Sequence, residues 1–154
     1  VEQRLLKIKQ DLGAAYGSET FWPACPRSRA SLDAIAEWGK NTFAEGVLRI
    51  FVYEVRMPAA TRDPAFLAAA VENLIPLAKI FEGFLRGREW VGGDHFTFAD
   101  IACGHILHRY FSLDWDRPDL PMLRDYYEKL QQRTAYQQNA MVPFDDLKGS
   151  YRPL

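Results

Sequence analysis

Three histidines and two cysteines are the side chains of this 154-residue sequence that most directly suggest metal or nucleophilic chemistry. His105 and His108 are three residues apart, so they would share one face of a helix. A zinc site needs two further ligands, and neither a cysteine nor a carboxylate stands at a suggestive spacing. We therefore expect no metal site. We interpret both residues as packed or hydrogen-bonded helix histidines and His95 as a solvated turn residue.

Cys25 and Cys103 are too few for a disulfide framework, and a reducing cytoplasm is the simplest location for them. Cys25-Pro26-Arg27-Ser28 superficially resembles a reactive Cys-Pro motif that leads into a helix. Such a motif needs a strand before it, whereas the loop Phe21-Trp22-Pro23 precedes it here. We expect a packed or idle linker thiol. No Ser-His-Asp spacing and no glycine loop for phosphate are found, so we predict no catalytic residues in this chain.

The stretch from Gly92 to Phe111 contains the signals of a helix start. Thr97 stands at the N-cap position with Asp100 three residues later, which predicts a capping box. Phe96 and Ile101 occupy the positions of a hydrophobic staple. The helix that follows is apolar on most of its faces, which is typical of a central helix surrounded by others. We interpret Thr97 and Asp100 as structural residues.

The remaining apolar periodicity predicts further helices around this one. The expected helices are a short one over residues 4–17, the longest over 27–57, a second long one from Asp63 to the turn at Gly87, one over 120–132, and a short one capped by Thr134. Gly39 and Gly46 lower the helix propensity of the longest helix by about 1 kcal/mol each. They are favoured where another segment or a ligand comes close. Pro76 should bend the second long helix. The tail after Met141 is expected to be irregular and to lie over the surface.

Bulk composition indicates a single soluble globular domain, with 48% hydrophobic and 25% charged residues. The net charge of −1 and the lack of a basic run give no support for nucleic-acid binding. No unbroken apolar stretch approaches the length needed to span a bilayer, and the charged first twelve residues are no signal peptide. The chain begins with Val1, which suggests a piece of a longer protein.

Several motifs in this sequence resemble one family. Gly93-Asp94-His95-Phe96-Thr97-Phe98-Ala99-Asp100-Ile101, with Trp90-Val91-Gly92 before it, looks like the central-helix start of the glutathione S-transferase C-terminal domain. The end of that helix, His108-Arg109-Tyr110-Phe111, and the later Arg117-Pro118-x-Leu120-Pro121 are similar to bacterial members. The resemblance covers roughly residues 15 to 145.

The resemblance implies an all-α bundle of five to six helices, without the thioredoxin-like domain of the full-length family. Residues 18–154 would be the helical domain, and residues 1–17 a remnant of the end of the missing N-terminal domain. That domain holds the γ-glutamyl end of glutathione through a Glu-Ser pair, whose positions here would be near Arg4 and Leu5. The pair is absent, so we do not carry that site over.

The resemblance also implies a role in detoxification: binding of a small hydrophobic electrophile by a cytoplasmic homodimer that uses glutathione as co-substrate. The N-terminal domain would bind and activate the thiol. The C-terminal domain would contribute the electrophile pocket from its first long helix and its central helix. By position, the candidate pocket residues are Trp38, Asn41, Thr42, Glu45, His105, His108 and Phe111. Trp38 and Phe111 could equally be core residues.

Two other functions stay open at this point. The same domain could serve as a non-catalytic module for protein association, which an exposed apolar stripe would favour. It could also carry apolar ligands without chemistry. In either case we predict that the 154-residue chain alone does not conjugate glutathione.

Overall fold

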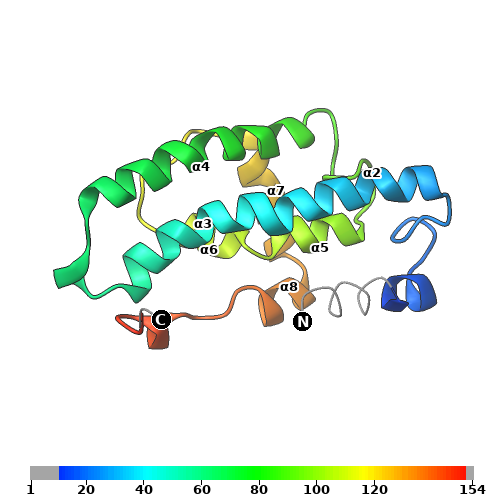
Figure 1. Cartoon of the computed structure of the whole chain (residues 1–154). Helices are drawn as coiled ribbons and strands as arrows, with labels where there is room; N and C mark the ends of the chain where they lie inside the picture. The colour runs from blue at the N-terminus through cyan, green and yellow to red at the C-terminus, as the bar shows by residue number, and fades with distance from the viewer. Residues whose placement is uncertain (1–10, 152–154) are drawn as a thin grey trace.

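The computed structural model describes residues 11–151, which form a bundle of helices (Figure 1). Residues 11–16 are helical, and the named helices are α2 (Pro26–Glu37), α3 (Ala44–Phe51), α4 (Pro64–Phe84), α5 (Phe98–Gly104), α6 (Leu107–Ser112), α7 (Pro121–Gln131) and α8 (Thr134–Asn139). Within residues 11–151 there is no β-strand, and Trp90 and Gly93 form an isolated β-bridge. The all-α prediction is confirmed. The part of the predicted first helix before residue 11 lies outside the described residues.

The longest predicted helix is confirmed as a continuous helical run from Pro26 to Arg56. It contains two π-helical segments, Trp38–Phe43 between α2 and α3, and Val52–Arg56 after α3. The first π segment contains Gly39, where α5 comes close. A Cβ on Gly39 would lie 3.0 Å from the Cα of Cys103 and nearer still to its Sγ. The predicted close approach at this glycine is therefore confirmed, and the sulfur of Cys103 fills the space that a side chain would need.

Replacing Gly39 with alanine is expected to lower the free energy of unfolding by about 1–3 kcal/mol, because Cys103 cannot retreat without moving its backbone. Gly83→Ala, also in a helix, is the matched control, since a Cβ there meets nothing within 4 Å. We expect that control to be neutral or stabilising by about 0.5–1 kcal/mol. Urea unfolding followed by circular dichroism measures both. Equal effects of the two substitutions would contradict this account of Gly39.

Helix α4 begins as predicted, with Asp63 as N-cap and Pro64 at the first helical position. The Asp63 carboxylate accepts a hydrogen bond from the Ala65 amide at 2.9 Å. Helix α4 runs beside α3 and the π segment Trp38–Phe43, with Leu74 and Phe81 fully buried in the core (Figure 1). By length and composition alone α4 could cross a membrane, a property that helices of soluble proteins can share.

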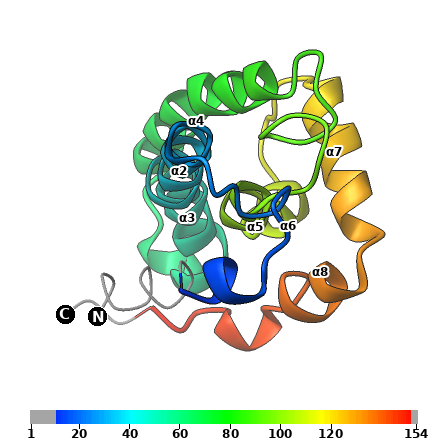
Figure 2. The same ribbon diagram turned by 90° about the vertical axis from the view of Figure 1, so that its right-hand side faces the viewer.

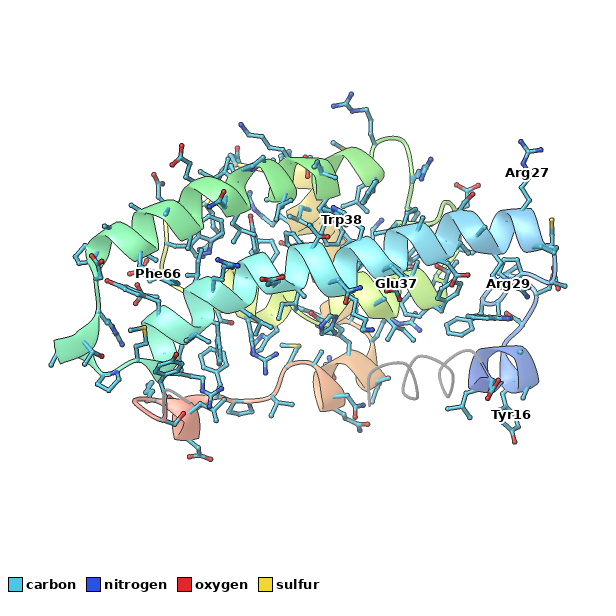
Figure 3. The ribbon with its side chains drawn as sticks, in the orientation of Figure 1. Tyr16, Arg27, Arg29, Glu37, Trp38 and Phe66 are labelled. Atoms are coloured by element: carbon cyan, nitrogen blue, oxygen red, sulfur yellow. The ribbon has the colours of Figure 1, made fainter. Side chains whose placement is uncertain are left out.

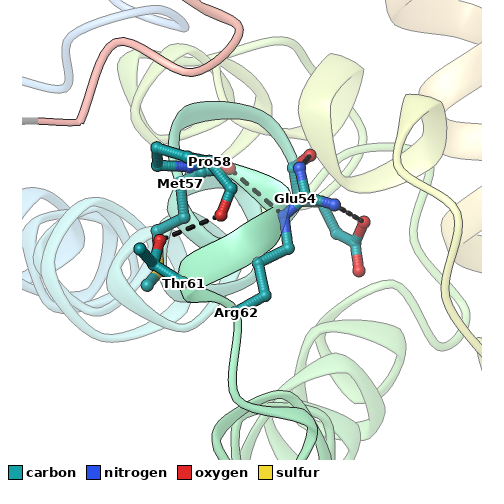
Figure 4. A network of polar contacts seen from close by, with 5 residues as sticks. All are labelled: Glu54, Met57, Pro58, Thr61 and Arg62. Atoms are coloured by element: carbon teal, nitrogen blue, oxygen red, sulfur yellow. Dashed lines mark hydrogen bonds and ion pairs between the residues drawn. The ribbon is translucent and has the colours of Figure 1, made fainter.

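Arg62 closes the turn that joins the first long helix to α4 (Figure 4). Its Nη2 donates to the carbonyl oxygen of Glu54 at 2.7 Å, and its Nε donates to that of Met57 at 3.2 Å. These are carbonyls at the end of a helix, which lack partners in the helix itself. The Thr61 hydroxyl donates to the Pro58 carbonyl oxygen at 2.9 Å. The Arg62 side chain thus supplies the hydrogen bonds that the amides of a further helical turn would otherwise donate to the carbonyl oxygens of Glu54 and Met57.

The central helix was predicted to be continuous, and that prediction is wrong. It is divided into α5 and α6, with a turn at residues 105–106 between them. The hydroxyl of Tyr136 donates to the carbonyl oxygen of Gly104 at 2.9 Å, so this carbonyl is bonded from outside the helix at the point of the break. The capping box of Thr97 and Asp100 is confirmed. Ile101, the expected staple partner of Phe96, is 51% exposed.

The last part of the chain completes the bundle: α7 lies across α5 and α6 from α2 and α3, and α8 and the tail run along the bottom of the view in Figure 2. Helix α7 buries Leu123, Tyr127 and Leu130, as predicted. The short helix after it begins at Thr134, so the prediction that Thr134 is its cap is wrong: Arg133 stands at the N-cap position, and its side chain makes no capping hydrogen bond. The tail then crosses to the end of the first long helix, where the Gly149 amide donates to the Val55 carbonyl at 2.9 Å.

Candidate binding site

A pocket of about 440 Å³ lies between the helical turn over residues 11–16, the first long helix and α5. The segment at residues 11–22 is held against the bundle by Trp22, whose ring centroid lies 4.5 Å from that of Phe98. The guanidinium of Arg29, labelled in Figure 3, lies over the Trp22 ring, 5.8 Å from its centroid. The walls are mostly apolar and come from Leu12, Tyr16, Phe21, Trp22, Ala36, Phe98, Ile101 and Ala102.

Three charged side chains of the first long helix line the same pocket: Asp33, Glu37 and Lys40. Burial raises the pKa of Asp33, the positive charge of Arg29 opposes that shift, and Glu37 adds to it. The amide of Asn41 donates to the Glu37 carboxylate at 2.8 Å and so fixes its position. The arrangement combines apolar walls with a few convergent polar groups, as pockets for small molecules do.

Ile101 also lines a second pocket, of about 320 Å³, between α5, α7 and α8. The second pocket is lined by His105, Arg133 and Tyr136, among others. Arg133 packs its guanidinium 3.6 Å from the centroid of the Phe96 ring. Helix α8 and the turn over residues 11–16 lie on the same side of the bundle in both views (Figures 1 and 2). One side of the bundle therefore carries two neighbouring apolar hollows, with Ile101 in the wall of each.

The seven predicted pocket residues do not meet in one place. Asn41, Thr42 and Glu45 line a groove on the side toward α4, where Glu45 pairs with Arg49 at 2.9 Å. Trp38 is half-buried and points toward α4, where it meets the rings of Phe81 and Phe84 (Figure 3).

The three candidates from the central helix are also separated. His105 lines the second hollow beside α8. The Nδ1 of His108 lies 3.1 Å from the hydroxyl of Tyr127, and Phe111 stacks on the same tyrosine ring at 4.5 Å. Neither His108 nor Phe111 lines either of the two neighbouring hollows. No local pattern indicated Trp22 and Phe98 as pocket residues, because the wall that they form requires the loop before α2 to fold back onto α5.

The two cysteines differ in exposure and in thiol acidity. Hydrogen bonds from the amide and side chain of Ser28 lower the pKa of the Cys25 thiol, which is exposed at the start of α2. Burial raises the pKa of the Cys103 thiol far above its ordinary value. We therefore expect iodoacetamide at neutral pH to alkylate Cys25 alone, as peptide mass spectrometry would show. Labelling of both thiols at similar rates in the folded chain would contradict this assignment.

Burial and the positive charge of Arg109 lower the pKa of His108 below its ordinary value. The folded state therefore binds a proton at this side chain less readily than the unfolded state does. Stability contributed by neutral His108 is fully present above the unfolded pKa of about 6.5 and is lost as pH falls toward the folded pKa. NMR titration of the imidazole signals should give a His108 pKa below 6.5, and His108→Gln should flatten the pH dependence of unfolding in that window. A His108 pKa above 6.5 would contradict this prediction.

Comparison with known proteins identifies the family of this fold. A family model described as the glutathione S-transferase C-terminal domain matches residues 64–129, from α4 into α7. The glutathione-bound theta class glutathione S-transferase of Xanthomonas axonopodis pv. citri is 32% identical, with a TM-score of 0.81. The match covers 88% of this chain and 71% of that one. The chain belongs to the glutathione S-transferase family.

The chain spans somewhat less than two thirds of the length of other glutathione S-transferases that it matches. Glutathione S-transferase GstB of Escherichia coli strain K12 is 27% identical over 136 residues, and the chain spans 65% of its length. The Bombyx mori glutathione transferase BmGSTD1 is 20% identical, shares the fold with a TM-score of 0.73, and is covered over 62% of its chain.

Proposed function

We propose that this chain forms the electrophile-binding part of a glutathione transferase, which joins glutathione to small hydrophobic electrophiles. The observation that carries the proposal is the apolar pocket of about 440 Å³ where the first long helix and α5 meet, in a member of this family. Apolar walls such as Phe98 and Ile101 would bind the electrophile and exclude water from it. Glu37 and Lys40 would orient its polar groups.

In this proposal the thiol of glutathione is bound and activated by a thioredoxin-like domain, as the family resemblance implies. The thiolate attacks the electrophilic carbon, and the leaving group departs with its bonding electrons. Our assignment gives the chain a role in binding and orientation, with no catalytic side chain and no metal. Among residues 11–151 no cluster of three metal-binding side chains is found. The sequence analysis expects this chain to lack the thioredoxin-like domain, and this expectation stays a prediction.

The seven residues predicted from the sequence to line the electrophile pocket fall into two groups according to their positions in the structure. Asn41 contacts Glu37 of the pocket, and His105 lines the adjoining hollow. We propose that these two extend the electrophile site. Trp38, Thr42, Glu45, His108 and Phe111 stay predictions as substrate-binding residues, and any such role requires a second subunit or domain beside them.

We further propose a homodimer through the outer side of α4 and the groove between α3 and α4. Phe66 and Ile80 expose 43% and 45% of their surface there, as does Leu48 of α3 at 41%. Burying such side chains against a second copy would stabilise association. Analytical ultracentrifugation should show a dimer that Ile80→Arg converts to monomer. We also propose a cytoplasmic location, because the two cysteines are free thiols, as is usual in a reducing compartment.

The pocket is tested by titrating the chain with 1-chloro-2,4-dinitrobenzene while NMR follows the indole N–H of Trp22. We expect that signal to shift on binding, and Ile101→Arg to weaken binding by about tenfold or more because it places a charge in the pocket. Val142→Arg, at another exposed aliphatic residue, is the control. Unchanged affinity in Ile101→Arg would contradict the pocket assignment. Binding by the chain, with no turnover by the protein made in its source cells, would favour the alternative of a non-catalytic binding module.

A further inference from the structure

A further pocket, of about 410 Å³, opens at the loop between α6 and α7. It is separate from the two neighbouring hollows described above. Its walls include the rings of Tyr110, Phe111 and Trp115, and two arginines, Arg117 and Arg124, also line it. Its volume lies within the range of about 300–1,000 Å³ that is usual for small-molecule sites. None of its lining residues belongs to the electrophile pocket proposed above.

The loop holds an aromatic ring and a guanidinium in fixed positions at this pocket. The indole Nε1 of Trp115 donates to the carbonyl oxygen of Tyr110 at 3.2 Å. The Nη1 of Arg117 donates to the same carbonyl at 3.4 Å and also to that of Leu113. The guanidinium of Arg117 thus lies 5.9 Å from the centroid of the Trp115 ring while half-buried. Both of these bonds use Nη1, and Nε and Nη2 take no part in them.

The charges at the pocket favour a small anion. Arg124 is paired with Asp119 at the rim, and both are exposed. The amides of Met122 and Leu123, at the start of α7, already donate to the carboxylate of Glu82. Recognition of an anion must therefore come from the two arginines and not from the helix start. A planar guanidinium matches a carboxylate through two parallel hydrogen bonds.

We propose that this pocket binds a small planar aromatic carboxylate at a site separate from the electrophile pocket. The ring of the ligand packs against Trp115 and Phe111, and its carboxylate pairs with Arg117. Arg124 adds a second positive charge once it turns from Asp119 toward the ligand. Rigid aromatic walls and a preformed guanidinium reduce the entropy lost on binding.

Naphthalene-2-carboxylate is a suitable probe, with naphthalene-2-carboxamide as its neutral counterpart. NMR titration of the 154-residue chain should shift the indole N–H signal of Trp115 with the carboxylate, and the amide should bind about tenfold more weakly. Arg117→Lys should weaken binding of the carboxylate by about tenfold because the planar fork is lost. Asp119→Asn should tighten it, since this change releases Arg124 and removes a negative charge. Arg27→Gln, far from this loop at the start of α2, removes one positive charge as a control (Figure 3).

The tightening expected in Asp119→Asn separates a binding role from a structural one, because a fold defect would weaken binding instead. Circular dichroism confirms that each variant is folded before titration. The proposal is overturned if Trp115 does not respond to the carboxylate, or if the amide binds equally well. It is also overturned if folded Arg117→Lys and Asp119→Asn bind as Arg27→Gln does.

Discussion

Replacing Asp100 with alanine is expected to lower the free energy of unfolding by about 3–5 kcal/mol. The side chain is fully buried, and its two oxygens accept four hydrogen bonds. Oδ1 accepts from the Val91 amide at 3.0 Å and the Tyr126 hydroxyl at 3.0 Å. Oδ2 accepts from the Thr97 amide at 2.7 Å and the Thr97 hydroxyl at 3.0 Å. Alanine would leave all four donors without this acceptor inside the core, where water does not replace it.

Asp63→Ala is the matched control, because Asp63 is an exposed N-cap with one capping hydrogen bond. That change should cost about 1 kcal/mol. Urea unfolding measures the loss of stability in both variants. It thereby compares an ordinary N-cap with a carboxylate that accepts hydrogen bonds from the loop before α5 and from α7. If Asp100→Ala costs no more than Asp63→Ala, Asp100 acts as a cap alone.

Replacing Glu82 with alanine is expected to cost about 2–4 kcal/mol. The side chain is 9% exposed and joins α4 to the start of α7. Its carboxylate accepts from the Met122 amide at 3.2 Å and the Leu123 amide at 2.7 Å, which are free donors at a helix start. The negative charge also suits the positive end of α7.

Glu72→Ala is the control for Glu82→Ala, since Glu72 is an exposed glutamate of the same helix. It should change stability by less than about 0.5 kcal/mol. Hydrogen exchange adds a local measurement: the amides of Met122 and Leu123 should exchange faster in Glu82→Ala. Unchanged exchange at these two amides would show that Glu82 does not cap α7.

Features that depend on neighbours in the sequence were predictable. The capping box of Thr97 and Asp100 spans three residues, and the start of α4 at Asp63-Pro64 spans two. The glycines in the longest helix predicted close packing, because nothing else explains two residues of low helix propensity there. Gly46, like Gly39, has a close neighbour, with the Leu74 side chain 3.0 Å from where its Cβ would stand.

Features that depend on distant residues were missed. Glu82 is forty residues from the amides that it caps, and no local pattern links them. The break after α5 involves a hydrogen bond from Tyr136, more than thirty residues later. Leu120 has no capping side chain of its own, which is a local sign that the start of α7 needs an external acceptor.

The candidate site was predicted only in outline. A pocket does lie between the first long helix and α5, but the residues assigned by position lie on several sides of these helices, and their role as substrate-binding residues stays a prediction. Asn41, Thr42 and Glu45 follow the π segment or lie within it, where helical periodicity no longer indicates the direction of a side chain. The walls provided by Trp22 and Phe98 come from two segments about 76 positions apart, and their meeting requires the complete fold.

The most direct test of the account is the steady-state kinetics of glutathione conjugation to 1-chloro-2,4-dinitrobenzene by the polypeptide that the source cells make. We predict that Ile101→Arg raises KM for the electrophile by about tenfold or more and leaves KM for glutathione unchanged. Val142→Arg should alter neither, and the 154-residue chain alone should show no turnover. An unchanged KM for the electrophile, or turnover by the isolated chain, would contradict the role assigned to this domain.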